Sequence, residues 1–450
     1  MDAQQAGSNT PTPTTILMLP WLGYGHVSAY FELAKALSSR NNFHIYLCST
    51  PVNLDFIKSK LIPSSSSFIQ FVELHLPSSP EFPPHVHTTN ALPVHLTPTL
   101  HQAFDAAAPR FEAILQTLSP HLLIYDYFQS WAPRLASSLN IPAINFNTSG
   151  TSMICHGFHS IHYPNSKFPV SDFVLHNHWK AKFNSALSEH ARSVKEAFFY
   201  CFNASCDVIL TNSFREVDGK YMDYLSLLLK KKVIPIGPLV YKPNEEEEDE
   251  DYWRIKNWLD KKEALSTVLV SFGSESYASE EEKEEVGNGL EESETNFIWV
   301  ERVSLKEDQE QERRGFVERA GERALVLKGW APQGKILKHG SIGGFVSHCG
   351  WNSVLESIVS GVPIIGVPIS GDQPFNVGVV EEAGVGVEAK RDPNGKIQRQ
   401  EVAKLIKQVV VEKTREELRM KVREMSEILR KKRDEKIDEM LAQISLLCNI

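Results

Sequence analysis

Short apolar runs alternate with amphipathic segments along most of this chain. In the first half, the runs predict strands at residues 16–19, 44–50, 122–126, 142–146, 208–213 and 233–238. In the second half, they predict strands at residues 267–274, 296–300, 324–330, 343–350 and 364–367. Helical periodicity lies between several of them, for example at residues 27–39 and 132–139. Strands separated by helices predict an α/β protein with parallel sheets covered on both faces.

The domain organisation follows from length and from a change in composition. A chain of 450 residues is long enough for two domains of ordinary size. Residues 242–251 (KPNEEEEDED) are strongly acidic, and we interpret them as a solvated linker. We therefore expect a loose polar tail at residues 1–14, an N-terminal domain at 15–238, a linker at 239–251 and a C-terminal domain at 252–431. Residues 414–447 predict an amphipathic helix.

Composition narrows the class of protein. Apolar residues make up 42% and charged residues 23% of the chain, as in globular proteins, and the net charge of −9 argues against a nucleic-acid partner. The six cysteines have no CxxC or zinc-site spacing, which suits a reducing compartment. No run has the length of a membrane span, and the N-terminus lacks a signal-peptide pattern. We expect a cytoplasmic monomer without a transmembrane segment.

The most informative stretch covers residues 330–373, WAPQGKILKHGSIGGFVSHCGWNSVLESIVSGVPIIGVPISGDQ. It predicts a strand that ends at Gly350, a helix that opens at Asn352 and Ser353 and stops at Gly361, and a second strand. A glycine-flanked turn from a strand into a helix presents backbone N–H groups and the positive end of the helix dipole. This arrangement suits a phosphate or a diphosphate.

The side chains along this stretch suit the parts of a nucleotide sugar. Trp330 offers a flat face for a uracil ring, Gln333 can bond the nucleoside, and Glu356 can accept from ribose hydroxyls. The remaining candidates are, for the diphosphate, His348, Asn352 and Ser353, and for the sugar, Trp351, Asp372 and Gln373.

Each of these residues also has a purely structural interpretation. Ser353 and Glu356 have the spacing of a helix capping box. His348 and Trp330 would fit a protein core, and Asp372 follows Gly371 as a turn residue would. Only the joint pattern favours a ligand site.

That joint pattern resembles the signature box of the plant secondary-product UDP-glycosyltransferases. The matching residues are Trp-Ala-Pro-Gln at 330–333, His-Cys-Gly-Trp-Asn-Ser at 348–353, Glu356, and Asp-Gln at 372–373. The resemblance implies a GT-B fold, in which two Rossmann-like parallel-sheet domains face each other across a cleft. It also implies that a final helix, at about 432–450, packs back on the first domain. The donor-binding residues would include Ala331 and Ser274, with UDP-glucose as co-substrate, no further cofactor and no metal.

His26 and Asp126 are the candidate catalytic pair. His26 follows the first predicted strand at the start of a helix, where the dipole favours a neutral imidazole that can accept a proton. Asp126 ends another predicted strand and would orient the ring. Matching residues have these roles in the family, whose reaction inverts the configuration of the sugar. A strand-end acid without a catalytic role is the alternative for Asp126.

The acceptor is less constrained by the sequence. The N-terminal half resembles glycoside-branching glucosyltransferases of the cucurbit mogroside type, which add glucose to sugars of triterpenoid glycosides. The aromatic residues that would line the acceptor site, or else belong to the core, are Trp21, Tyr24, Tyr30, Phe128 and Phe146. Three alternatives remain: glucosylation of an aglycone such as a flavonoid, a catalytically silent UDP-sugar-binding protein, and an epimerase of the same fold.

Overall fold

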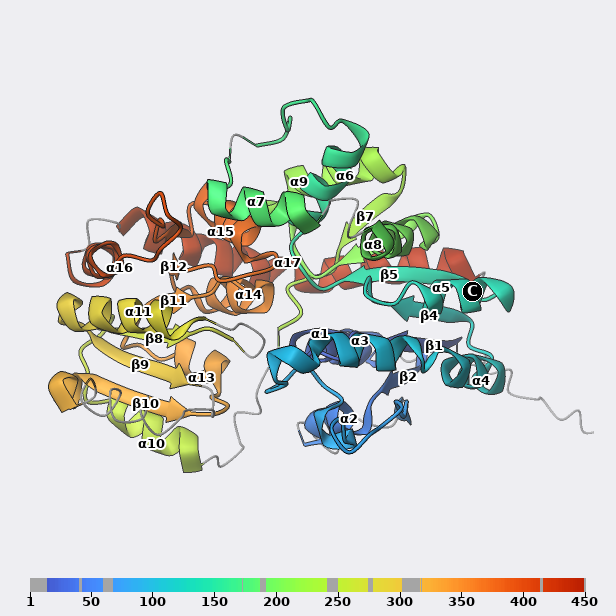
Figure 1. The fold of residues 1–450 in the computed structure, drawn as a ribbon, viewed down its shortest axis with the longest axis horizontal. Coiled ribbons are helices and arrows are strands. Elements are labelled where there is room, and N and C mark those ends of the chain that lie inside the picture. Colours follow the sequence, from blue (N-terminus) through green and yellow to red (C-terminus); the bar gives the residue numbers. More distant parts are fainter. Residues whose placement is uncertain are drawn as a thin grey trace, which may run out of the picture.

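The structure is a computed structural model that describes residues 14–39, 43–59, 68–171, 173–186, 192–240, 250–273, 278–301, 316, 318–412 and 416–448. Two parallel sheets dominate it, each covered by helices on both faces (Figure 1). The predicted α/β class with two parallel-sheet domains is therefore confirmed.

The first sheet has seven strands in the order β3-β2-β1-β4-β5-β6-β7. Its strands are β1 (Thr14–Leu19), β2 (Phe43–Ser49), β3 (Ile69–Glu73), β4 (Leu122–Tyr125), β5 (Ala143–Asn147), β6 (Val208–Thr211) and β7 (Lys232–Pro235). Strand order reverses between β1 and β4, which are direct neighbours with Leu19 beside Tyr125. Ligands of open parallel sheets bind beyond the carboxyl ends of the strands at such a point.

The first half of the chain supplies the helices around this sheet, except that α7 lies against the second domain, where Phe183 packs on Phe375 (Figure 1). They are α1 (Tyr24–Ser38), α2 (Pro51–Lys58), α3 (Thr97–Asp105), α4 (Ala108–Leu118), α5 (Trp131–Ser138), α6 (Thr151–His162), α7 (Asn177–Ala186), α8 (Arg192–Ala204) and α9 (Arg215–Leu229). The proline-rich segment between β3 and α3 has two short 3-10 turns, Pro84–Val86 and Val94–Leu96.

The second sheet has six strands in the order β10-β9-β8-β11-β12-β13. They are β8 (Thr267–Ser271), β9 (Asn296–Glu301), β10 (Ala324–Lys328), β11 (Ile342–Ser347), β12 (Ile364–Gly366) and β13 (Gly386–Glu388). The helices are α10 (Glu250–Leu259), α11 (Glu280–Ser293), α13 (Gln333–Leu337), α14 (Trp351–Ser360), α15 (Gln373–Glu382), α16 (Arg399–Ile406) and α17 (Glu416–Cys448). A 3-10 turn, Gly321–Arg323, precedes β10, and a π-helical turn, Lys407–Val411, follows α16.

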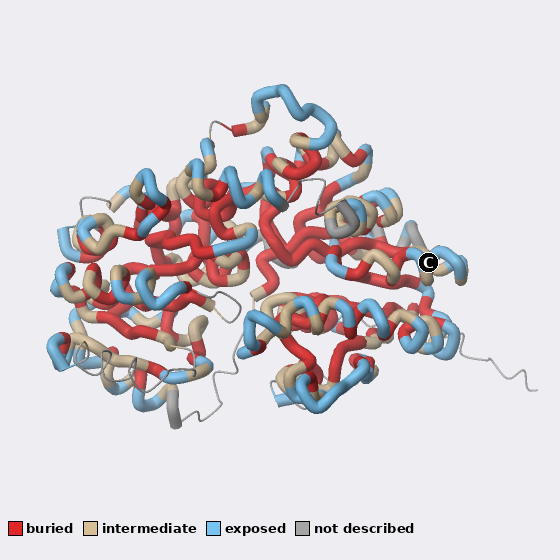
Figure 2. The backbone as a smooth tube through the Cα atoms, in the orientation of Figure 1, coloured by how far each residue is buried: buried red, intermediate tan, exposed pale blue. Residues whose placement is uncertain are grey.

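Buried residues concentrate along both sheets and between them (Figure 2). One cluster of buried side chains is shared by the two domains, because Trp351 and Leu355 of α14 pack in the same core as Tyr125 and Tyr221. The last helix also belongs to both domains. Its first half packs against α14, and its second half adds Ile437 to the cluster under the first sheet.

Among the helices of the described ranges, none combines the length and the apolar character that a membrane crossing requires.

Candidate active site

The residues His26 and Asp126 meet at the carboxyl ends of the neighbouring strands β1 and β4. His26 Nδ1 lies 2.7 Å from Asp126 Oδ2. The carboxylate is fully buried, whereas the imidazole side chain keeps 14% exposure. Asp126 also accepts from the backbone N–H of Tyr127 at 2.7 Å and of Trp21 at 3.3 Å. These donors hold the carboxylate against Nδ1, so proton acceptance from a substrate falls to Nε2.

Thr148 is a member of this cluster that sequence reasoning missed. Its hydroxyl Oγ1 lies 2.8 Å from His26 Nδ1. Thr148 follows β5, the strand beside β4, so the same sheet edge that positions Asp126 positions this hydroxyl as well. Its position directly after a central parallel strand could have identified Thr148 as a candidate site residue.

The turn from β11 into α14 has the backbone of an anion site. Cys349 adopts a φ of 63°, which is rare for a non-glycine residue, and Gly350 is the N-cap without any side-chain cap. A Cβ added at Gly350 or at Gly273 would lie 2.4 Å from His348 Nε2. The imidazole of His348 therefore packs between two glycines beside the start of the helix, where a diphosphate would be bound.

The capping-box interpretation of Ser353 is wrong, because α14 begins at Trp351 and Ser353 lies inside its first turn. The side chain of Ser353 instead accepts from Gln333 Nε2 at 3.1 Å, and the same nitrogen donates to Glu356 Oε2 at 2.7 Å. Three residues assigned to the donor site are thus brought together and already oriented by one another.

Trp330 and Ala331 stand next to this group. Trp330 is 60% exposed, so its interpretation as a core residue is wrong. Ala331 is buried at 8% exposure in the core beneath the second sheet, and a donor contact there would have to come from its main chain. Ser274 lies outside the described residues.

Asp372 and Gln373 form the other end of the box. The amide oxygen of Gln373 accepts from the backbone N–H groups of Ile369 and Ser370 at 2.8 and 2.9 Å, which fixes the turn before α15. Burial raises the pKa of Asp372, although a hydrogen bond from Asn376 and the nearby charge of His26 oppose this shift. Asn376 Nδ2 donates to Asp372 Oδ2 and to the carbonyl of Cys349, both at 3.0 Å, and so links Asp372 to the turn before α14.

Two residues of the box join the domains. Asn352 Nδ2 donates to the carbonyl of Gly25 at 2.9 Å, one residue before His26. Trp351 Nε1 donates to the carbonyl of Asn212 at 2.7 Å, and its ring is only 3% exposed. Trp351 therefore lies in the contact between the domains, which accounts for its burial, whereas we had expected it to border the sugar.

The predicted acceptor aromatics divide into core and surface. Tyr30 and Phe146 are completely buried and contact each other beneath the first sheet, so their assignment to the acceptor site is wrong.

Phe128 is 38% exposed, and its ring centre lies 5.5 Å from that of His26. Trp21 is 3% exposed and stacks behind Phe128 at 4.7 Å. Tyr24 is partly buried and stacks on Phe56. Of these rings, Phe128 is the one best placed to meet an acceptor.

Comparisons with known proteins agree with this arrangement. Residues 251–438 match the family model described as UDP-glucoronosyl and UDP-glucosyl transferase, and residues 13–241 match the glycosyltransferase N-terminal domain. A Siraitia grosvenorii protein named mogroside IIIx synthase is 68% identical over 457 residues, covering 100% of this chain and 96% of the relative. UDP-glucosyltransferase 29 of Panax ginseng is 48% identical over 434 residues, covering 96% of this chain and 97% of the relative.

Solved structures show the same fold. The Glycyrrhiza uralensis protein complexed with glycyrrhetinic acid 3-O-monoglucuronide superposes with a TM-score of 0.84 at 23% identity, covering 97% of this chain and 96% of that one. The chain belongs to the plant UDP-glycosyltransferase family, as its signature box predicted, and its two domains form the GT-B fold.

Proposed function

We propose that the protein transfers glucose from UDP-glucose, with inversion, to a sugar hydroxyl of a triterpenoid glycoside and forms a β-glycosidic bond. The observation that carries the chemistry is the 2.7 Å contact between His26 and the buried Asp126. This pair lies beside the start of α14, the helix inside the signature box at residues 330–373, which we call the donor box from here on. The choice of acceptor rests on the 68% identity to mogroside IIIx synthase.

The reaction assigns one task to each group. His26 Nε2 takes the proton of the acceptor hydroxyl, and the oxygen forms a bond to the anomeric carbon as the bond from that carbon to the UDP oxygen breaks. Asp126 stabilises the imidazolium that results. Negative charge that develops on the departing diphosphate faces the N-terminus of α14, where backbone N–H groups and the helix dipole are available.

The donor residues are part of this proposal. Trp330, Gln333 and Glu356 bind the nucleoside, and His348, Asn352 and Ser353 lie at the diphosphate. Asp372 and the amide nitrogen of Gln373 bind the sugar hydroxyls, because the amide oxygen of Gln373 already holds its own turn.

The His26–Asp126 pair argues against the alternative of a UDP-sugar-binding protein without catalytic activity. Such a protein would have no use for a buried carboxylate that orients an imidazole next to an interdomain site.

We further propose that one chain is sufficient for activity, because the base and the donor box both come from it. Five cysteines, Cys48, Cys155, Cys201, Cys206 and Cys349, have free thiols, which is compatible with a reducing cytosol.

A product screen tests the function. The purified protein would be incubated with UDP-glucose or UDP-galactose and with paired acceptors, a triterpene and a flavonoid each as aglycone and as glucoside, with products identified by mass spectrometry and NMR. We expect β-glucosylated triterpene glycosides. Turnover of aglycones alone would overturn the acceptor assignment, and transfer of galactose in preference to glucose would overturn the donor.

The variant His26→Ala tests the base in the same assay. It should lose transfer and keep its affinity for UDP, measured by calorimetry. An unchanged turnover rate would refute the role of His26.

A further inference from the structure

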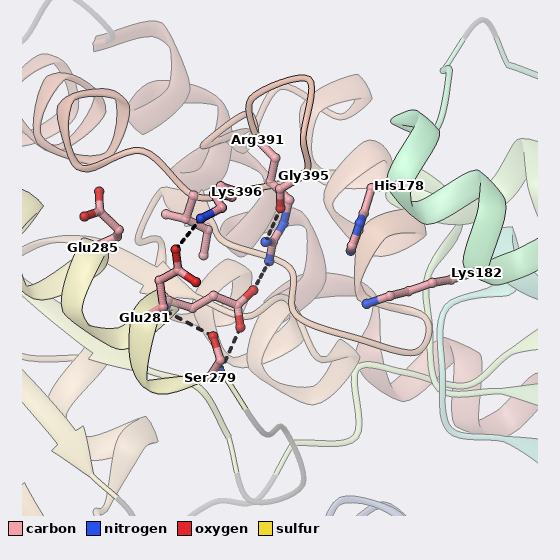
Figure 3. A pocket seen from close by; sticks show the side chains of 10 residues that line it. His178, Lys182, Ser279, Glu281, Glu285, Arg391, Gly395 and Lys396 are labelled. Carbon is pink, nitrogen blue, oxygen red and sulfur yellow. Dashed lines mark hydrogen bonds and ion pairs between the residues drawn. The ribbon is translucent and has the colours of Figure 1, made fainter. Parts of the chain in front are cut away.

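The polar hollow between α7 and the first turns of α11 is crossed by its own ion pairs (Figure 3). Arg391 pairs with Glu282 at 2.7 Å, and Lys396 pairs with Glu281 at 2.6 Å. A ligand would have to break these pairs, so the hollow offers no ready site. His101 on α3 differs, because its imidazole makes no hydrogen bond within the part of the chain that the structure describes.

His101 belongs to a group of three stacked rings. Its imidazole stacks on Trp21 with ring centres 4.4 Å apart, and Phe128 stacks on Trp21 at 4.7 Å. The centres of His101 and Phe128 are 6.0 Å apart, whereas rings on opposite faces of the indole would be separated by nearly twice the stacking distance. The two rings therefore lie side by side on one face of Trp21, which accounts for its exposure of only 3%.

The imidazole of His101 brings hydrogen-bonding capacity to this aromatic group. Burial lowers its pKa, although the charge of Asp105 opposes this shift, so the ring is neutral at pH 7 and has one donor and one acceptor nitrogen. His101 is only partly buried, so a ligand can reach it. A purely apolar molecule that covered the ring would leave both nitrogens without partners, which is unfavourable. The site therefore favours a ligand with hydroxyl groups.

Phe128 connects His101 to the candidate base. Its ring centre lies 5.5 Å from that of His26 and 6.0 Å from that of His101. Two steps of this size span one hexose with a hydrogen bond at each end. A hexose with its C–H groups on Phe128 could thus present one hydroxyl to His26 and a second one to His101.

The tilt between the rings also favours a sugar over a flat aromatic acceptor. The planes of Phe128 and His101 are inclined by 49°. A planar polycyclic molecule cannot stack on both rings at once. A puckered hexose can contact the face of Phe128 and still form a hydrogen bond with the edge of His101.

We propose that His101 is a specificity-determining residue of the acceptor site, which hydrogen-bonds a second hydroxyl of the hexose that receives glucose and so selects the hydroxyl that reaches His26. The inference rests on the proposed function, because it requires an acceptor that already has a sugar. Its consequence is that the protein forms one linkage and not a mixture of positional isomers.

The test uses two replacements of His101 that separate its ring from its nitrogens. His101→Phe keeps an aromatic ring on Trp21 and removes both nitrogens, whereas His101→Gln keeps a donor and an acceptor and removes the ring. His95→Phe is the matched control, an exposed histidine just before α3. Each protein would be incubated with UDP-glucose and a triterpene monoglucoside. Initial rates, melting temperatures and the linkage of the products by NMR would be measured.

We expect His101→Phe to raise the KM for the monoglucoside about threefold to tenfold, the effect of one lost neutral hydrogen bond, and to give products linked at more than one hydroxyl. Its KM for UDP-glucose should stay as in the wild type. His101→Gln should retain the single linkage, and His95→Phe should behave like the wild type. An unchanged KM and a single linkage in His101→Phe would overturn the proposal. Mixed linkages in both His101 variants would also overturn it, because the ring and not its nitrogens would then set the linkage.

A second measurement needs no variant and does not depend on how the variants fold. Among the monodeoxyglucosides of the same triterpene that still react with the wild type, the one that lacks the hydroxyl bonded to His101 should have a KM raised by the same factor. Equal KM values across that series would overturn the role of His101. Absence of transfer to any glycoside by the wild type would instead overturn the proposed function itself.

Discussion

Replacement of Asp126 by Asn separates the charge of the orienting residue from its shape. His26 Nδ1 lies 2.7 Å from the buried carboxylate. Once the ring is protonated, the two charge centres are about 4 Å apart, and their attraction is worth about 4 kcal/mol at an effective dielectric constant of about 20. Loss of that attraction in the transition state corresponds to a fall in kcat of about a thousandfold.

The Asn side chain adds a second effect in the same direction. Its amide N–H group would donate to Nδ1, which forces the ring proton onto Nε2, the atom that has to accept. The fold should persist, because Asn Oδ1 can still accept from the backbone N–H of Tyr127, now 2.7 Å from the carboxylate.

The assay measures UDP release under saturating substrates, UDP affinity by calorimetry, and thermal unfolding. Asp55→Asn, an exposed carboxylate on α2, is the matched control and should behave like the wild type. A kcat of Asp126→Asn within about threefold of the wild-type value would refute the electrostatic role. Equal losses in kcat and in UDP affinity would show that the donor site, and not the base, had been damaged.

Three further changes test other parts of the site. Trp330→Ala should weaken UDP binding by about 1–3 kcal/mol in calorimetry without lowering the melting temperature, because the ring is 60% exposed; equal affinities would exclude stacking. Gly350→Ala should displace His348, since the new methyl group would lie 2.4 Å from Nε2. The KM for UDP-glucose should therefore rise at least tenfold. Gly340→Ala is the control, because a Cβ there meets no atom within 4 Å, and its KM should equal that of the wild type. Burial lowers the pKa of His156 to about 4, so stability should fall by up to about 3 kcal/mol as the pH drops from about 6.5 to 4. His156→Gln should flatten this dependence in urea unfolding, and an unchanged slope would contradict it.

Much of the fold was accessible from the sequence because buried parallel strands are continuous apolar runs. The runs around Ile16, Leu122 and Val268 all became central strands. The strands β3 and β13 were missed, because β3 (IQFVE) mixes apolar with polar residues and β13 has only three residues, Gly386–Glu388. Neither segment contains a continuous apolar run of the length on which such predictions depend.

The site was predictable where residues that belong to one sequence motif also lie close together in the structure. Gln333, Ser353 and Glu356 belong to one motif and meet in space. Burial was harder to predict, because the residue type of an aromatic side chain does not show whether it lies in the core or lines a pocket. Tyr30 and Phe146 therefore appeared equivalent to Phe128 until their exposure was known.

The path of α17 determines how acceptor preference can be transplanted between relatives. Its second half supplies Ile437, Met440 and Ile444 to the core beneath the first sheet, although these residues follow the whole second domain in the chain. A chimaera with a single junction after residue 240 would set a foreign helix against that core. The exchangeable unit is discontinuous, and a working graft has to take the tail of the last helix from the same protein that supplies the N-terminal domain.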